Sequence, residues 1–105
     1  MGQFNVYKNK NPQTRSAIPF LLDVQSDLLS NLETRVVVPL CPAPAIKGKP
    51  LRVLTPVLEI AGEPYVMLTP QMAGISRSEL GPVVGSLERS RFEIIAAIDF
   101  LVTGI

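Results

Sequence analysis

Short apolar runs separated by polar segments make up the first 40 residues, a pattern that is typical of an antiparallel sheet. In the segment FNVYK, Phe4 and Val6 recur at period 2 and Tyr7 falls on the opposite face, as in a half-buried strand. The segments 18–25 (IPFLLDVQ) and 34–40 (TRVVVPL) are rich in branched and apolar residues. They predict two further strands of the same sheet.

Turn-forming residues separate these runs and shape the middle of the chain. The segment 8–16 holds several Asn, Pro and Ser residues and predicts a solvated hairpin loop. The segment 41–56 contains four prolines and predicts a loop with short edge strands, part of a small outlying sheet. Two apolar runs within 57–68 flank Gly62, which can adopt a positive φ, and predict a β-hairpin.

The apolar pattern changes to helical spacing near the C-terminus. Leu87, Arg91, Ile94, Ile98 and Leu101 recur along one helix that we expect to begin between residues 86 and 90. Ser90 and Glu93 have the spacing of a capping box, and Ser86 is an alternative cap. Apolar residues from 92 to 102 occupy nearly all sides of this helix, so a second surface should cover it. That surface is either a second copy of the chain or the small barrel itself.

Length and composition restrict the class of protein. The chain has 105 residues, and we expect a single domain over 1–105. Its 10 basic and 9 acidic residues give a net charge of +1, which does not favour direct binding to nucleic acid. The longest uncharged stretch, 64–76, is too short for a membrane span, and residues 1–6 lack a secretory pattern. We therefore expect a cytoplasmic protein, with Cys41 as a small buried hydrophobe rather than a reactive thiol.

The residue types offer little catalytic chemistry. The sequence has no histidine and one cysteine, which removes the commonest general base and the usual zinc or iron–sulfur ligand sets. Asp23 and Asp27 are expected to cap turns rather than to share a catalytic proton. The segment GPVVG, at 81–85, matches no phosphate-binding fingerprint. We therefore assign no catalytic residue, metal ligand or cofactor.

Four segments carry a resemblance to a known family. They are QFNVYKN near the start, LLDVQSDLL at 21–29, RVVVPL at 35–40, and the closing TGI after an apolar helix. In this order, end to end, they resemble the CcdB family of bacterial toxins. The resemblance implies a mainly β (α+β) fold: an SH3-like barrel of antiparallel strands, as in CcdB and MazF toxins, with a small outlying sheet and one C-terminal α-helix.

The resemblance also implies a function. A CcdB-like protein is the homodimeric toxin of a type II toxin–antitoxin module, with roles in plasmid maintenance and transcription regulation. It binds the A subunit of DNA gyrase, traps the gyrase–cleaved DNA complex and blocks replication, so it meets DNA only through gyrase or the antitoxin complex. The disordered tail of the antitoxin CcdA neutralises it. This is a poison that acts by binding, not an enzyme.

The family pattern can be carried over to individual residues. It implies gyrase-binding residues at Ser26, Leu28, Leu29, Asp99, Thr103, Gly104 and Ile105. Asp99 is a conservative match to the asparagine of the family's best-known member, whereas Thr103 departs from the pattern, because that member has tryptophan there. Phe100, Leu101 and Val102 are expected in the dimer interface, and the basic residues Lys8, Lys10 and Arg15 are expected to attract the acidic antitoxin.

Three alternatives remain open from the sequence. A MazF-type ribonuclease toxin would use a basic groove, for which the chain offers Arg15, Arg35, Arg52 and Arg77. A non-toxic homologue would bind only the antitoxin, an alternative that Thr103 keeps open. The side chain of Ile105 would either anchor a symmetric partner, with Gly104 allowing close backbone approach, or pack under the barrel.

Overall fold

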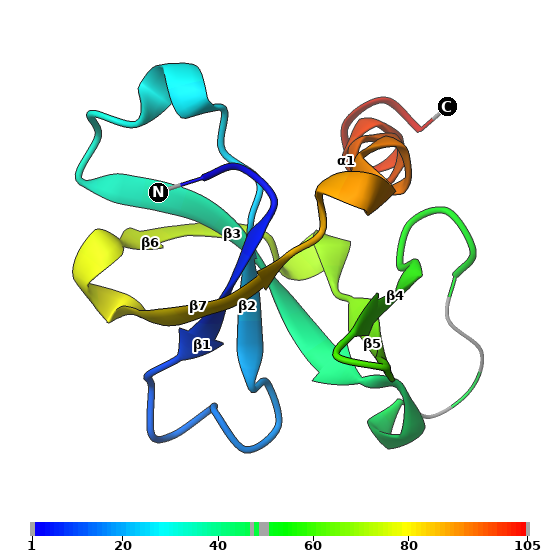
Figure 1. Ribbon diagram of the computed structural model, residues 1–105. Helices are drawn as coiled ribbons and strands as arrows, with labels where there is room; N and C mark the ends of the chain where they lie inside the picture. Colours follow the sequence, from blue (N-terminus) through cyan, green and yellow to red (C-terminus); the bar gives the residue numbers. More distant parts are fainter. Residues whose placement is uncertain (1, 47, 49–50, 105) are drawn as a thin grey trace.

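One curled antiparallel sheet of seven strands and a C-terminal helix form the protein, as a computed structural model shows (Figure 1). The structure describes residues 2–46, 48 and 51–104. The elements are β1 (Asn5–Asn9), β2 (Phe20–Asp23), β3 (Thr34–Pro42), β4 (Val57–Ile60), β5 (Glu63–Met67), β6 (Ala73–Ser76), β7 (Leu80–Ser86) and α1 (Arg91–Thr103). The mainly β fold with one C-terminal helix confirms the predicted fold class.

Strand β3 connects two parts of the sheet. The strand order is β4-β5-β3-β2-β1-β7, and β6 pairs with the first half of β3. The second half of β3 pairs with β5, so the β4–β5 hairpin extends from the barrel as a small outlying sheet. Among the strand pairs of the described residues none joins β6 to β7, and the barrel is open there. In Figure 1 the hairpin lies beneath the helix, beside the barrel.

The predicted strands are present with shifted ends. Strand β2 is shorter than the predicted 18–25, whereas β3 continues through Cys41 to Pro42, where a loop was predicted. Pro39 has no N–H to donate, but its carbonyl accepts a hydrogen bond from Leu68 N at 3.0 Å, and Pro42 ends the strand. The hairpin turn is as predicted, with Gly62 at φ 83°.

Strands β6 and β7 were not predicted. Strand β7, with the sequence LGPVVGS, contains two glycines and a proline, which are depleted in strands. It lies at the edge of the sheet, where Pro82 does not interrupt a central ladder. From Pro82 to Val84 both faces of β7 are exposed, so its sequence has no alternation to recognise.

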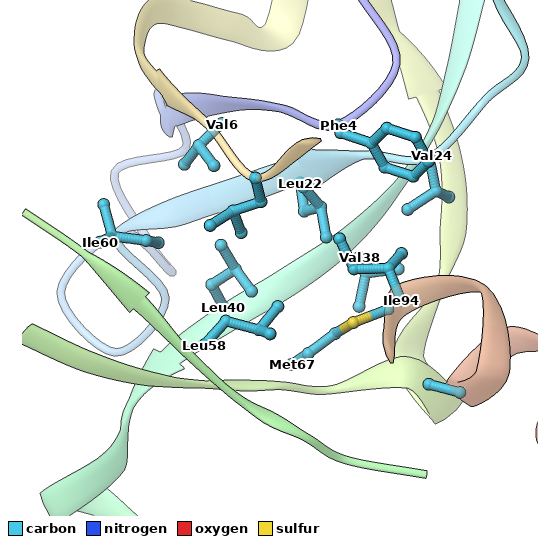
Figure 2. Packing of buried hydrophobic residues seen from close by; sticks show 12 residues of the cluster. Phe4, Val6, Leu22, Val24, Val38, Leu40, Leu58, Ile60, Met67 and Ile94 are labelled. Atoms are coloured by element: carbon cyan, nitrogen blue, oxygen red, sulfur yellow. The ribbon is translucent and has the colours of Figure 1, made fainter. Parts of the chain in front are cut away.

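Two groups of apolar side chains cover the two faces of the barrel strands. The larger lies between the sheet and α1 and includes Phe4, Val6, Leu22, Val38, Leu40, Met67 and Ile94 (Figure 2). The smaller lies on the opposite face and consists of Tyr7, Leu21, Val37 and Leu80. Tyr7 is therefore buried, and the prediction of a half-buried first strand is wrong because the curled sheet covers the second face of β1 as well.

Helix α1 begins one residue beyond the predicted range. A 3-10 turn at Glu88–Ser90 precedes it, and Ser86 Oγ accepts a hydrogen bond from Glu88 N at 3.2 Å. The Ser90 side chain makes no capping hydrogen bond, so the predicted capping box is absent, and Leu87 rather than Ser86 occupies the N-cap position of the preceding turn. Strand β7 positions the start of this turn. Leu87, the residue that follows β7, donates its N–H to Phe4 O at 2.8 Å.

Only one side of α1 packs on the sheet. Ile94 and Ala97 are buried and Ile98 is half-buried. The exposed apolar side chains of the helix are Phe92, Ile95, Phe100, Leu101 and Val102, with Phe92 83% and Val102 72% exposed. Within one chain the small barrel thus leaves much of the helix uncovered. Among the described residues, no helix has the length and apolar character needed to cross a bilayer.

Candidate partner-binding site

A short turn after β2 presents two leucines to solvent. The 3-10 turn Asp27–Leu29 is capped by Ser26, whose Oγ accepts a hydrogen bond from Leu28 N at 3.2 Å. Leu28 is 93% exposed and Leu29 is 50% exposed. Adjacent exposed leucines on an ordered turn are typical of a contact surface for a partner. Three of the predicted site residues, Ser26, Leu28 and Leu29, therefore lie together.

A buried ion pair lies at the base of this turn. Arg35 Nη2 is 2.7 Å from Asp23 Oδ2, and Arg35 Nε donates to the same oxygen at 2.9 Å. Both side chains are fully buried. Burial raises the pKa of the Asp23 carboxyl above its ordinary value of 3.8, although hydrogen bonds from Arg35 and the Gln25 N–H act in the opposite direction. The pair joins the end of β2 to β3.

Asp23 and Asp27 have separate partners. Asp23 Oδ1 accepts a hydrogen bond from Gln25 N at 3.0 Å, which confirms the predicted turn cap at this position. Asp27 Oδ1 instead accepts from Gln3 N at 2.8 Å and holds the N-terminal segment, so the prediction of a local cap at Asp27 is wrong. This contact could not be predicted from the sequence because the two residues are 24 positions apart.

The end of α1 is the second predicted part of the site. Thr103 Oγ1 donates to Asp99 O at 2.7 Å, which directs the hydroxyl back along the helix. Gly104 has φ 75°, and its N–H donates to Phe100 O at 2.9 Å, so it ends the helix in the left-handed conformation. Ile105 lies outside the described residues.

Gly104 is surrounded by open space, so the predicted role in close backbone approach is not seen within this chain. A Cβ built at Gly104 would meet no atom within 4 Å. Within this chain the glycine is therefore required by its positive φ, not by a close backbone approach. Asp99, Thr103 and Gly104 are all exposed at the end of the helix.

The basic residues predicted for the antitoxin form a separate surface. Lys8, Lys10 and Arg15 are exposed on β1 and the loop after it. A Cβ built at Gly81 would lie 3.0 Å from Lys8 Cβ and 3.3 Å from Lys10 Cγ, so these lysines pack beside the start of β7. In Figure 1 the β1–β2 loop lies at the lower end of the molecule, whereas the turn 27–29 and the end of α1 lie toward the upper end.

Two of the arginines proposed for a ribonuclease groove have structural partners. Arg35 is fully buried against Asp23. Arg77 Nη1 donates to Ser30 O at 3.3 Å and to Leu32 O at 3.4 Å, bracing the loop that follows the turn 27–29. The described part of the chain also holds no group of three or more His, Cys, Asp or Glu side chains arranged to bind a metal ion. These contacts weaken the ribonuclease alternative.

A comparison with protein families decides the assignment. The model of the family described as CcdB protein matches residues 3–104, nearly the whole chain. The chain belongs to the CcdB family. CcdB proteins are gyrase-targeting toxins of toxin–antitoxin systems, in agreement with the resemblance of the sequence. Within this CcdB protein, sequence reasoning missed the buried Asp23–Arg35 pair and the Gln25 contacts, which match no motif.

Proposed function

We propose that this protein binds the A subunit of DNA gyrase, traps gyrase on cleaved DNA and is neutralised by the antitoxin CcdA. The observation that carries the proposal is the ordered, exposed leucine pair at 28–29, found in a chain that belongs to the CcdB family. The helix end with Asp99, Thr103 and Gly104 lies toward the same end of the molecule (Figure 1). In this proposal one large partner surface contacts both segments, and the toxin acts by binding rather than by catalysis.

The exposed apolar side of α1 supports a homodimer. Phe100, Leu101 and Val102 are each at least 38% exposed in the single chain. Exposed apolar residues of this number on one helix favour an interface. A two-fold dimer would present two copies of the turn 27–29 and two helix ends to a symmetric partner.

The basic loop supports electrostatic attraction of the antitoxin. An acidic, disordered CcdA tail would associate faster with Lys8, Lys10 and Arg15, with a rate that falls as salt increases. This loop lies toward the end of the molecule opposite to the turn 27–29 and the end of α1 (Figure 1), so the two partners need not compete for the same charges.

Gyrase-dependent DNA cleavage tests the function. The protein is incubated with purified gyrase, ATP and supercoiled plasmid, and linear DNA is measured after detergent and protease treatment. We expect cleavage with the parent protein and about 100-fold less with Leu28→Asp, because a charge replaces an apolar contact at the interface. The control is Leu51→Asp, an exposed leucine in the loop 51–56, which should cleave as the parent does. Cleavage of RNA without gyrase, or no gyrase-dependent cleavage, would contradict the proposal.

A further inference from the structure

The side chain of Gln25 connects the exposed turn to the barrel. Its Nε2 donates to Leu29 O at 2.9 Å, and its Oε1 accepts from Val36 N at 3.0 Å. Gln25 is 6% exposed, so its side chain is buried, and both hydrogen bonds are partly buried. One amide thus links the last residue of the turn 27–29 to strand β3.

The backbone of Gln25 is fixed by the buried ion pair. Its N–H donates to Asp23 Oδ1 at 3.0 Å, and Arg35 Nη2 contacts its carbonyl oxygen at 3.4 Å. Arg35 in turn pairs with Asp23. Because these groups are buried and polar, a change at one of them leaves its partners without a hydrogen bond. The conformation of Gln25 is therefore set by Asp23 and Arg35 together.

Contacts from two other elements hold the turn from outside. Gln3 N donates to Asp27 Oδ1 at 2.8 Å, and Arg77 Nη1 donates to Ser30 O at 3.3 Å. Neither of these hydrogen bonds involves Leu28 or Leu29. Among the hydrogen bonds of the described residues, the carbonyl of Leu29 accepts from one side chain, through Gln25 Nε2, and from the backbone N–H of Leu32 at 3.2 Å.

We propose that Gln25, held by Asp23 and Arg35, is a positioning residue for the partner-binding turn: it fixes the direction in which Leu28 and Leu29 leave the barrel. This inference rests on the proposed contact between the turn and gyrase. Exposed leucines bind a partner tightly only if their geometry is fixed before binding, because ordering a mobile turn costs free energy. The buried polar group supplies that order from beneath, where no partner competes with it.

The substitution Gln25→Glu separates this role from a general effect on the fold. A carboxylate keeps the acceptor for Val36 N but replaces the donor to Leu29 O with an oxygen, which repels that carbonyl. We expect the protein to stay folded, the amides of residues 28–30 to exchange with deuterium faster, and the affinity for the purified gyrase A subunit to fall about 10-fold or more. Gln25→Met, which removes both hydrogen bonds, should weaken binding at least as much.

A destabilised variant far from the turn is the matched control. Ile60→Val removes one methylene from β4 in the core, lowers the melting temperature, and should leave both the gyrase affinity and the exchange of residues 28–30 unchanged. Suppose that Gln25→Glu and Ile60→Val lower the melting temperature by the same amount and also weaken gyrase binding by the same factor. Gln25 then acts only through stability, and the inference is wrong.

Two further outcomes distinguish this inference from the proposed function. If Leu28→Asp abolishes gyrase binding while Gln25→Glu binds as the parent does, the turn binds gyrase but Gln25 does not position it. If neither the parent nor any variant binds gyrase, the proposed function fails. Faster exchange confined to residues 28–30 in Gln25→Glu would still support the positioning role in that case, and unchanged exchange would contradict it.

Discussion

Gly104 shows how one residue decides where the helix ends. Its φ of 75° is costly for any residue with a Cβ, although the space around it is open. The sequence pointed to Gly104 through the family pattern, but the physical requirement became clear only from the backbone angle. Substitutions of Gly104 therefore test the left-handed backbone conformation and not a packing contact.

We expect Gly104→Ala to lower the free energy of unfolding by about 1 kcal/mol and to change the direction of the tail, because alanine disfavours the left-handed region. Gly104→Asn is the matched control, since asparagine tolerates that region and should keep both stability and tail direction. Urea denaturation and gyrase-dependent DNA cleavage measure the two effects. Equal activity of the alanine and asparagine variants would show that the left-handed angle is not needed for binding.

Arg35 is the residue on which the charge of Asp23 depends. Burial raises the pKa of Asp23, so the folded protein holds this proton to a higher pH than the unfolded chain does. Ionisation of Asp23 therefore lowers the free energy of unfolding as the pH rises through the folded pKa. Arg35 lowers the pKa of Asp23. A substitution that removes Arg35 therefore raises this pKa further and makes ionisation of Asp23 more costly.

We expect Arg35→Met to lose about 3–5 kcal/mol of stability at pH 7, because an unpaired carboxylate stays buried. The loss should be smaller at pH 4, where Asp23 is more fully protonated. Denaturant titrations at both pH values measure the difference. The double variant Asp23→Asn with Arg35→Met should recover part of the stability and lose the pH dependence; a loss that is equal at the two pH values would contradict the argument.

At the scale of elements, the strands that were predicted and those that were missed differ in composition. Strands β2 and β3 are rich in buried branched residues, and the β4–β5 turn carries its glycine at the expected place. Strand β7 is held instead by its pairing with β1, across more than 70 residues of sequence. The candidate site shows the same difference between local and non-local signals. The exposed leucines could be predicted because they belong to a family motif, whereas Arg35 contacts Asp23 from a neighbouring strand and could not be predicted.

The pairing of β7 with β1 can be tested with two glycines of one strand. A Cβ at Gly81 would lie 2.8 Å from Lys8 O, whereas a Cβ at Gly85 would meet nothing within 4 Å. We expect Gly81→Ala to cost about 1–3 kcal/mol of stability because the two strands must separate, and Gly85→Ala to change it little. Thermal melting of both variants provides the measurement, and equal melting temperatures would show that the contact at Gly81 relaxes without cost.

At the scale of the whole molecule, the single chain leaves an apolar surface that its own barrel does not cover. Phe92, Ile95, Phe100, Leu101 and Val102 remain exposed along α1. The sequence indicated this surface correctly, because apolar residues on all sides of a helix exceed what one sheet can bury. The sequence pattern does not identify which protein covers α1, because any apolar surface of complementary shape could bury these side chains.

We expect the protein to sediment as a dimer at micromolar concentration and Leu101→Asp to shift it to monomer, because a buried charge without a partner is costly in an interface. The control Val83→Asp places the same charge on an exposed apolar residue of strand β7, outside α1, and should remain dimeric. Analytical ultracentrifugation over a range of concentrations measures both variants. A monomeric parent protein would refute the interface.

The order of the strands also has a consequence for synthesis on the ribosome. Strand β1 precedes the other strands in the chain, yet its neighbour β7 and helix α1, whose Ile94 shares the core with Phe4, come much later. Contacts this distant in sequence form only when nearly all of the chain is available. A nascent polypeptide that lacks β7 and α1 therefore has neither a closed core nor the helix end, so we expect a CcdB protein of this topology to bind a partner only after both elements have been synthesised.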